Sequence, residues 1–579
     1  MPKNIVIRFC GDSGDGMQLT GNMFSSLSAV LGCQISTLPD FPAEIRAPQG
    51  TLGGVSGFQV KVGNSVTTPG DKADVIIAMN SAALKVCVQR QLFTDHAILV
   101  VDTDSFTKAD LLKADYRTDN PFTELHIKES VQILPVPLTS LTKEALKDSG
   151  MDNKSILKSR NMFAFGVVCW LFDLPIDKAI QYLEERFKKK PAVIPANVQS
   201  LTDGYNYGNN LALSINKLHP EKAIDMPHGR YTSIAGNKAT AWGLIAAALK
   251  AGKHLFLGGY PITPATDIMQ ELAARKDMGV MVVQAEDEIA GICTSIGAGF
   301  AGDLACTCTS GPGLSLKSEG LGLAVMAEIP LVVIDVQRGG PSTGLPTKTE
   351  QTDLLQALYG RNGECPLVVL AASTPANCFQ YAYEAAKIAL EHQTPVILLT
   401  DTYLANGSSL WQIPTLAELP AIHSIDMPHP GEEGRAYRNM GLEHDAQTGT
   451  ISTDPANHQV MVARRAKKVA DVVKDIPDLV VKGNPDADTL LIGWGSTEGH
   501  LLEAAELIGC ATTQFHYLNP LPANTAEVLK KYQRVVVCEL NSGQLAAVLR
   551  NQVPMIVLEQ YNEVTGQPLQ VAKLVEFLK

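Results

Sequence analysis

The chain lacks the cysteine pattern of a metal centre or a disulfide framework. Its 11 cysteines are scattered, and no C-x-x-C occurs in the sequence. Cys306 and Cys308 alternate along an expected buried strand, which favours small apolar core residues in a reducing compartment over metal ligands. We therefore expect this chain to bind no metal ion and no iron–sulfur cluster of its own.

Positive charge and long apolar runs are also scarce. Lys and Arg number 48 against 60 Asp and Glu, giving a formal net charge of -12 that disfavours nucleic acid as a partner. No basic run suggests a membrane surface, and apolar stretches such as 289–302 are too short and glycine-rich to span a bilayer. The start of the chain passes directly into a strand-like run without the pattern of a signal peptide. These features predict a cytoplasmic protein.

What the sequence does contain is a repeated alternation of strand-like and helical segments. With 579 residues, of which 45% are hydrophobic, the chain is long enough for several cores. The rhythm predicts an α/β fold of three doubly wound, mostly parallel domains. The weakly periodic stretch 411–486 is expected to be a long connection with local helices. The three predicted domains cover residues 1–205, 238–410 and 487–579. A linker at 206–237 separates the first two domains, and the connection at 411–486 separates the last two.

A glycine-rich turn follows the first expected strand. Gly11, Gly14 and Gly16 open a helix there, the setting of a phosphate cradle. The two aspartates between these glycines would repel a phosphate, and the spacing is G-x-x-G-x-G. Gly-Asp-Gly also begins the magnesium–diphosphate motif of thiamine enzymes, but the asparagine that completes that motif is missing from 39–46. The turn is therefore not predicted to bind a diphosphate, and its role stays open.

The most informative stretch is Gly259-Tyr-Pro-Ile-Thr-Pro264, which follows an apolar run. Its two prolines restrict the backbone and hold Thr263 extended between rigid points. Arg338 follows another expected strand, at the edge where doubly wound sheets bind ligands, and a guanidinium there can grip a carboxylate through two hydrogen bonds. A turn and a surface arginine are the structural alternatives.

Three acids, Glu286, Asp287 and Glu288, lie between an expected strand and an apolar, glycine-rich helix. A carboxyl at this junction can have a raised pKa and hydrogen-bond a ring nitrogen, and Glu286 is the first candidate for that role. The competing interpretation is that these acids cap the helix. Both interpretations can hold for different members of the trio.

Together these motifs resemble the α subunit of the 2-oxoacid:ferredoxin oxidoreductases, in the form with a γ domain fused at the N-terminus. Besides Tyr-Pro-Ile-Thr-Pro, the resemblance rests on the strings at 41–46, 337–344 and 537–544. It implies a γ-type domain, a pyrimidine-binding domain for thiamine diphosphate, and a domain like the C-terminal domain of transketolase.

The resemblance also implies a reaction and roles for residues. A 2-oxoacid is decarboxylated with thiamine diphosphate, coenzyme A accepts the acyl group, and electrons pass to ferredoxin. Thr263 and Arg338 would bind the substrate, and Glu286, with Glu288 as the alternative, would be the catalytic acid that activates the coenzyme. Arg46 is a candidate for a second substrate carboxylate, unless it forms a structural ion pair. The coenzyme would also contact Tyr260, Pro261 and Ile262.

The motifs that are missing imply a partner. In the family, the magnesium–diphosphate site and the 4Fe-4S cluster reside on a separate β subunit, so the chain alone is expected to be inactive. A dimer of αβ heterodimers is the expected assembly. The stretch at 41–48 is most similar to members that use 2-oxoglutarate, with pyruvate or branched-chain 2-oxoacids as alternatives. A transketolase-like transferase and a non-catalytic scaffold subunit are the alternatives of other classes.

Overall fold

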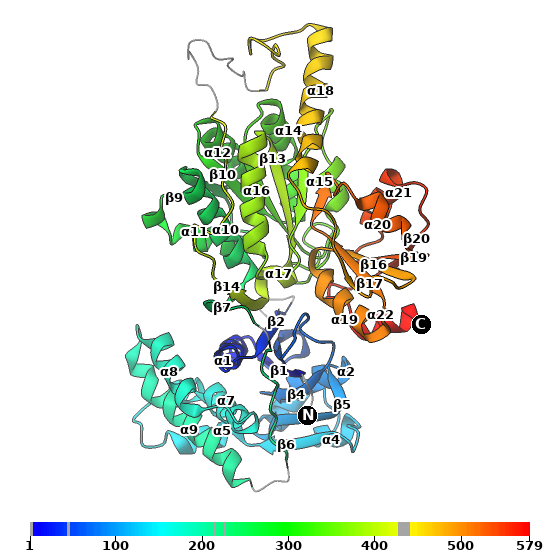
Figure 1. Cartoon of the computed structure of the whole chain (residues 1–579). Helices are drawn as coiled ribbons and strands as arrows, with labels where there is room; N and C mark the ends of the chain where they lie inside the picture. The colour runs from blue at the N-terminus through cyan, green and yellow to red at the C-terminus, as the bar shows by residue number, and fades with distance from the viewer. Residues whose placement is uncertain (1–3, 43–46, 212–214, 225, 427–440) are drawn as a thin grey trace. The chain divides into compact units, whose positions relative to one another are not determined.

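The computed structural model of the chain describes residues 4–42, 47–211, 215–224, 226–426 and 441–579 (Figure 1). The chain divides into two compact units, Met1–Ser233 and Ile234–Lys579. Both units have the α/β architecture that the sequence predicts. No helix within the described ranges is long and apolar enough to cross a membrane.

The first unit contains a sheet with a parallel half and an antiparallel half. Its strands are β1 (Asn4–Asp12), β2 (Gln34–Asp40), β3 (Val55–Gly63), β4 (Ala73–Ala78), β5 (Phe93–Asp102) and β6 (Gln132–Val136). They lie in the order β6-β5-β4-β1-β3-β2, and the neighbours from β6 to β1 are parallel. The β1–β3 and β2–β3 pairs are antiparallel, which the strand–helix rhythm did not predict.

Helices pack on this sheet and on each other. α1 (Met17–Val30) begins after Gly16, whose φ of 78° is a left-handed conformation that glycine adopts freely. α7 (Arg160–Leu171) is buried along nearly its whole length and packs against α9 (Ile194–Asn210) (Figure 1). The other helices of this unit are α2 (Ser81–Gln89), α3 (Lys108–Lys113), α4 (Pro121–Glu124), α5 (Leu138–Ala145), α6 (Asn153–Leu157) and α8 (Ile176–Phe187).

A large sheet forms the centre of the second unit. Its strands are β8 (Leu255–Gly259), β9 (Val280–Gln284), β10 (Leu304–Thr309), β11 (Leu331–Gln337), β12 (Val368–Ala371), β13 (Pro395–Asp401) and β18 (Tyr517–Asn519). They lie in the order β18-β12-β13-β11-β10-β8-β9, and β18 runs antiparallel to β12 while the other neighbouring strands are parallel. β10, β11 and β13 are buried throughout, which is typical of parallel strands covered on both faces.

Helices pack around this sheet, and one of them, α12, begins at the candidate residue Glu288. α10 (Gly236–Ala251) and α16 (Cys378–His392) pack against each other, while α12 (Glu288–Phe300) packs against β8 and β10 (Figure 1). The remaining helices around this sheet are α11 (Thr266–Ala273), α13 (Gly311–Leu316), α14 (Ser318–Met326), α15 (Leu354–Tyr359) and α17 (Thr402–Asn406). The short strands β7 (Tyr231–Ala235) and β14 (Ser408–Gln412) are not part of it.

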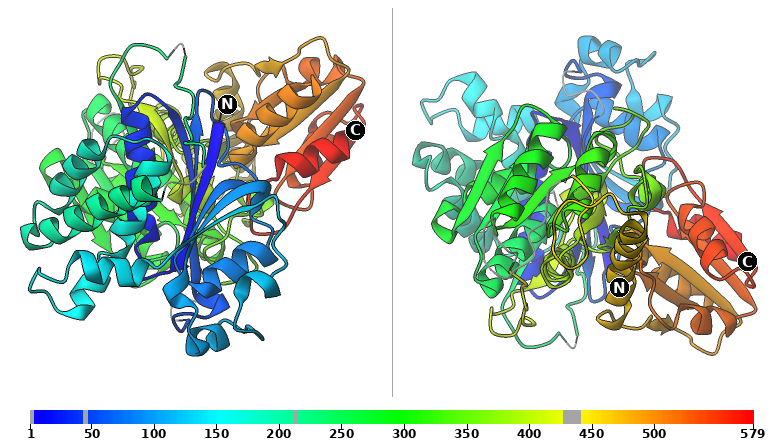
Figure 2. Two further views of the ribbon diagram at one scale, coloured as in Figure 1. Left: turned by 90° about the horizontal axis from the view of Figure 1, so that it is seen from below. Right: turned by 90° about the horizontal axis from the view of Figure 1, so that it is seen from above.

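A smaller sheet near the C-terminus belongs to the same unit (Figure 2). Its strands are β15 (Val481–Gly483), β16 (Thr489–Trp494), β17 (Ala511–Phe515), β19 (Arg534–Glu539) and β20 (Leu558–Asn562), in the order β15-β17-β16-β19-β20. The buried Gln351 joins the two sheets, because its Nε2 donates to the Trp494 carbonyl at 2.6 Å and its Oε1 accepts from the Leu540 N–H at 3.0 Å. The helices of this part are α19 (Glu498–Ile508), α20 (Thr525–Lys530), α21 (Gln544–Gln552) and α22 (Val571–Leu578).

The predicted connection at 411–486 contains a helix of its own. α18 (Pro455–Asp471) is capped by Asp454, whose side chain accepts from the Ala456 N–H at 2.7 Å. Arg465 on this helix donates to Glu443 through both terminal nitrogens, at 3.1 and 2.9 Å. A bidentate ion pair thus ties α18 to the described segment that precedes it. The domain boundaries drawn from the sequence stay predictions.

Candidate active site

The loop after β8 holds its shape through internal hydrogen bonds. The Ile262 N–H donates to Thr266 Oγ1 at 2.9 Å, and the Thr266 hydroxyl lies 2.9 Å from the Ile262 carbonyl. Asn237 Nδ2 donates to the Pro264 carbonyl at 2.8 Å and ties the end of the loop to α10. Thr263 is exposed, so the loop presents this side chain to solvent from a rigid base.

Tyr260 anchors the same loop in the interior. Tyr260 is 6% exposed, and its hydroxyl lies 2.9 Å from Thr309 Oγ1 at the end of β10. A Cβ at Gly313 would lie 2.1 Å from each of these oxygens and 2.9 Å from Glu288 Cγ. A glycine at 313 therefore lets α13 approach a cluster made of Tyr260, Thr309 and Glu288.

The three acids at the start of α12 occupy different environments. Asp287 caps the helix, since its Oδ1 accepts from the Ala290 N–H at 2.8 Å. Glu286 is exposed, whereas Glu288 is half-buried against Tyr260 and Gly313. The capping interpretation therefore applies to Asp287, and Glu288 is the carboxyl that the structure brings to the Tyr260 cluster.

Arg338 extends from the end of β11 to the same loop. The residue is 8% exposed, and its Nη1 donates to the Thr263 carbonyl at 2.6 Å. Its Nε is buried and makes no hydrogen bond with any described residue. Burial lowers the pKa of the guanidinium below its ordinary value. The two predicted substrate-binding residues thus lie together, joined through the Thr263 backbone, which leaves the hydroxyl exposed.

Two buried carboxyls near Arg338 were not predicted. Asp335 lies inside β11 with no exposed surface, and burial followed by the nearby Asp353 raises its pKa well above the ordinary value. Burial also raises the pKa of Asp353 to about 6. The pair therefore retains a proton at neutral pH. In the sequence, Asp335 stands out as an aspartate inside an apolar strand, whereas no local pattern marks Asp353 as part of a site.

Lys317 is a second residue that the sequence did not reveal. It lies between α13 and α14 with no exposed surface. Its Nζ donates to the Glu288 carbonyl at 2.7 Å and lies 5.1 Å from the centroid of the Tyr260 ring. In the sequence it reads as a surface lysine at the end of a short helix, so its burial at the site is a tertiary effect.

The first unit holds the other predicted features. Arg46 lies outside the described residues. In the glycine turn, Asp15 forms an ion pair of 2.7 Å with Arg160, and Asp12 accepts from the Gly50 N–H at 2.9 Å. Both aspartates therefore brace the turn itself. Across the described part of the chain, no group of three or more His, Cys, Asp or Glu could hold a metal ion.

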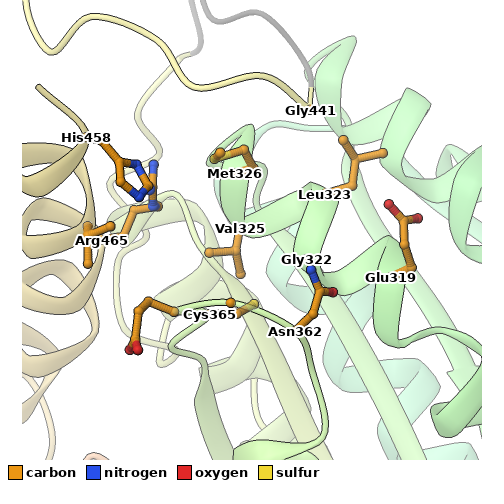
Figure 3. Close-up of a pocket in the computed structure, with 13 residues that line it drawn as sticks. Glu319, Gly322, Leu323, Val325, Met326, Asn362, Cys365, Gly441, His458 and Arg465 are labelled. Carbon is orange, nitrogen blue, oxygen red and sulfur yellow. The ribbon is translucent and has the colours of Figure 1, made fainter. Parts of the chain in front are cut away.

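A separate cavity of about 300 Å³ lies between α14, the turn at 362–365 and α18 (Figure 3). Glu319, Leu323 and Asn362 line it together with His458 and Arg465. None of the predicted site residues is among its lining. Because Arg465 and His458 both bind Glu443, its polar groups already serve the folding of the connection.

Comparisons with known proteins show which family the chain is similar to. Residues 247–477 match the family model described as pyruvate flavodoxin/ferredoxin oxidoreductase, thiamine diphosphate-binding, and residues 6–207 match that of pyruvate ferredoxin/flavodoxin oxidoreductase. The chain is 44% identical to the 2-oxoglutarate oxidoreductase subunit KorA of Mycobacterium tuberculosis, over 100% of this chain and 91% of that protein. It is 32% identical to a 2-oxoacid:ferredoxin oxidoreductase subunit α of Aeropyrum pernix, over 78% of this chain and 75% of that protein.

A solved structure is also similar over the whole chain. The 2-oxoglutarate:ferredoxin oxidoreductase from Magnetococcus marinus, with 2-oxoglutarate, coenzyme A and succinyl-CoA bound, matches with a TM-score of 0.86 and 30% identity. The match covers 100% of this chain and 99% of that chain. Sequence families, full-length relatives and fold agree, and the chain belongs to the 2-oxoacid:ferredoxin oxidoreductase family.

Proposed function

We propose that this chain is the α subunit of a coenzyme A-acylating 2-oxoglutarate:ferredoxin oxidoreductase. The enzyme converts 2-oxoglutarate to succinyl-CoA and CO₂ with electrons passing to ferredoxin, or runs the reverse reductive carboxylation. The observation that carries the proposal is the meeting of Tyr260, Glu288 and Arg338 at one loop beside the carboxyl ends of β8, β10 and β11. The substrate named for the relatives from M. tuberculosis and M. marinus supports the choice of 2-oxoglutarate.

The residues present suit the pyrimidine half of thiamine diphosphate. Tyr260 offers a buried aromatic wall, Glu288 a half-buried carboxyl, and Pro261 and Ile262 a rigid edge. Thiamine diphosphate, when bound, supplies the nucleophilic carbon and the electron sink for decarboxylation. The task of this chain is to hold a proton at a carboxyl oxygen against a ring nitrogen. We assign that task to Glu288 because of its burial, and Glu286 is the alternative.

Substrate orientation falls to Arg338 and Thr263. One guanidinium nitrogen of Arg338 is engaged by the Thr263 carbonyl, and its remaining donors can bind a carboxylate. The exposed Thr263 hydroxyl is available to the keto oxygen. The guanidinium should contribute more to orientation than to rate, since a contact kept through the transition state would oppose the loss of CO₂.

The site is exposed where a second polypeptide would complete it. On α12, Ile289 is 53% exposed, and Cys293 and Gly297 lie on the same face of the helix and are also exposed. Leu316 on α13 is 54% exposed. An apolar face next to catalytic groups suits a β subunit that carries the diphosphate site, Mg²⁺ and a 4Fe-4S cluster. A dimer of αβ heterodimers, with ferredoxin as electron acceptor, is the assembly we propose.

The second carboxylate of 2-oxoglutarate requires a further cation. Arg46, predicted from the sequence, stays our candidate for it. Replacing Arg46 with Gln should raise the KM for 2-oxoglutarate more than that for pyruvate. An equal change in both KM values would exclude this role.

The experiment that tests the function compares the purified chain with the complex formed by co-expression with its β subunit. We expect coenzyme A-dependent reduction of ferredoxin by 2-oxoglutarate in the complex and no turnover by the chain alone. Assays with pyruvate and branched-chain 2-oxoacids measure the preference. Turnover by the isolated chain would contradict the shared site, and faster turnover of pyruvate would contradict the substrate.

A further inference from the structure

Lys317 is a buried cation to which the proposed function gives no role. Lysine is rarely buried completely, because removing an ammonium group from water is costly unless partners compensate. Lys317 has no exposed surface and is one of the largest fully buried side chains of the described residues. A methionine or leucine would fill such a site at lower cost, so the charge itself needs an explanation.

The contacts of Lys317 all lead to the candidate site. Its Nζ donates to the Glu288 carbonyl at 2.7 Å, in the first turn of α12. The same nitrogen lies 5.1 Å from the centroid of the Tyr260 ring, a distance at which cation and ring attract each other. A Cβ built on Gly291 would lie 3.5 Å from Nζ, so the ammonium lies directly against α12.

The charged and titratable groups around Lys317 come from three elements. Burial lowers the pKa of Lys317 to about 8, and Cys308 on β10 and then Glu288 and Asp287 on α12 oppose this fall. Burial raises the pKa of Cys308 to about 12 and that of Tyr260 above its usual range, so both groups are neutral near physiological pH. Cys293 on α12 has a smaller influence. The ionised groups that Lys317 can stabilise are therefore the two carboxylates.

We propose that Lys317 is a positioning residue for Glu288, whose ammonium fixes the first turn of α12 against Tyr260 and places a positive charge beside the Glu288 carboxyl. The inference rests on the proposed function, in which Glu288 exchanges a proton with a bound ring. A neighbouring cation stabilises the negative charge of a carboxylate. This support is lost as Lys317 deprotonates.

The kinetic test uses Lys317→Met in the complex with the β subunit. Turnover should fall about tenfold, which corresponds to about 1.4 kcal/mol of activation free energy. The acid limb of the kcat profile should move to higher pH, because the Glu288 carboxylate loses the positive charge beside it. The alkaline limb that Lys317 causes near pH 8 should disappear. Lys276→Met, which alters an exposed lysine, should leave the profile unchanged.

Lys317→Gln separates the hydrogen bond from the charge. The glutamine amide can still donate to the Glu288 carbonyl. This variant therefore shows whether an effect of the methionine variant comes from the lost charge or from the lost hydrogen bond and altered packing. We expect Lys317→Gln to recover part of the turnover and to show the same altered pH profile as Lys317→Met. Wild-type profiles in both variants would overturn the proposal.

The melting temperature of the full chain, measured at several pH values, tests for the buried charge of Lys317 without an activity assay. The pKa of Lys317 falls from 10.5 to about 8 on folding, so the unfolded chain binds more protons between these values. Wild-type stability therefore rises with pH through that window. Lys317→Met should melt at a higher temperature than the wild type at about pH 7, and this difference should shrink towards pH 10.

The melting and activity measurements distinguish a failure of the Lys317 inference from a failure of the proposed function. A difference in melting temperature that does not change with pH would overturn the inference about Lys317, whatever the activity of the complex. A wild-type complex that does not use 2-oxoglutarate would instead overturn the proposed function, while the melting data would still test whether Lys317 carries a buried charge.

Discussion

Two of the turns that follow strands, one in each unit, differ in the partners of their charged side chains. In the first unit, Asp15 pairs with Arg160 and Asp12 accepts a hydrogen bond from Gly50. In the second unit, Arg338 leaves its Nε without a partner among the described residues, and Thr263 is exposed.

The difference separates a turn that supports itself from one prepared for a ligand. Buried polar groups are mostly hydrogen-bonded, so a buried donor without a partner needs an explanation, and at Arg338, beside the exposed Thr263, we explain it by a bound substrate. In the first turn Asp15 accepts from the Asp12 N–H and pairs with Arg160, and Asp12 accepts from the Gly50 N–H through one carboxyl oxygen, while its other oxygen has no partner among the described residues. In the second, the loop at 260–264 is braced from behind, and its polar groups stay available. The following changes test this contrast.

The largest effect is expected from Glu288→Gln. If Glu288 exchanges the proton, turnover of the complex should fall by about 10² to 10⁴. Glu286→Gln is the matched control, because it alters an exposed carboxyl two residues away and should leave turnover close to that of the wild type. Steady-state kinetics with 2-oxoglutarate would decide. The reverse pattern would return the role to Glu286.

Replacing Arg338 with Met should have the next largest effect. Losing hydrogen bonds to a charged group costs about 1.5 to 3 kcal/mol, so kcat/KM for the 2-oxoacid should fall roughly 10- to 100-fold. Arg275→Met removes an arginine that pairs with Glu271 on the outside of α11, and it should keep wild-type kinetics. Equal losses in both variants would mean that Arg338 supports the fold and does not bind substrate.

Gly313→Ala tests whether the Tyr260 cluster is as closely packed as the structure indicates. Its Cβ would lie 2.1 Å from Tyr260 Oη and from Thr309 Oγ1, and overpacking of this kind costs about 1 to 3 kcal/mol. Gly322→Ala is the control, since its Cβ meets open space within α14 and alanine is favoured in helices by about 0.5 to 1 kcal/mol. The melting temperatures should therefore shift in opposite directions. A tolerated alanine at 313 would contradict the arrangement of the cluster.

The sequence predicted the apolar parallel strands well. The segments 280–284, 489–494 and 534–539 are mainly apolar runs, and the structure forms a strand over each of them. β3 lacks a continuous apolar run, because Gln59 and Lys61 face the interior, where they bond to Pro69 and Thr68. Buried polar residues that are satisfied across strands hide the apolar pattern.

The same reasoning explains which site residues could be found. Thr263 and Arg338 follow apolar strands directly, and the carboxyl ends of parallel strands meet at one edge, so sequence and topology bring them together. Lys317 and Asp353 come from segments whose local pattern carries no functional signal, and only the packing of α13 and β11 brings them to the site. The choice between Glu286 and Glu288 likewise depends on the helix register, which places Asp287 at the cap.

The smallest effect concerns the turn that supports itself. Burial, followed by Asp15, raises the pKa of Asp12 from 3.8 to about 6. The folded chain therefore binds more protons than the unfolded chain between these values, and stability falls as pH rises through that window.

Asp12→Asn should remove this cost and stabilise the chain by about 1 kcal/mol at pH 7, while its amide oxygen still accepts from Gly50. At about pH 4, where Asp12 is already protonated in the fold, the gain should vanish. Asp148→Asn alters an exposed carboxyl and should show no such pH dependence. If Asp12→Asn instead destabilised the chain at pH 7, the turn would need the negative charge, and its likeness to a cation-binding loop would have to be reconsidered.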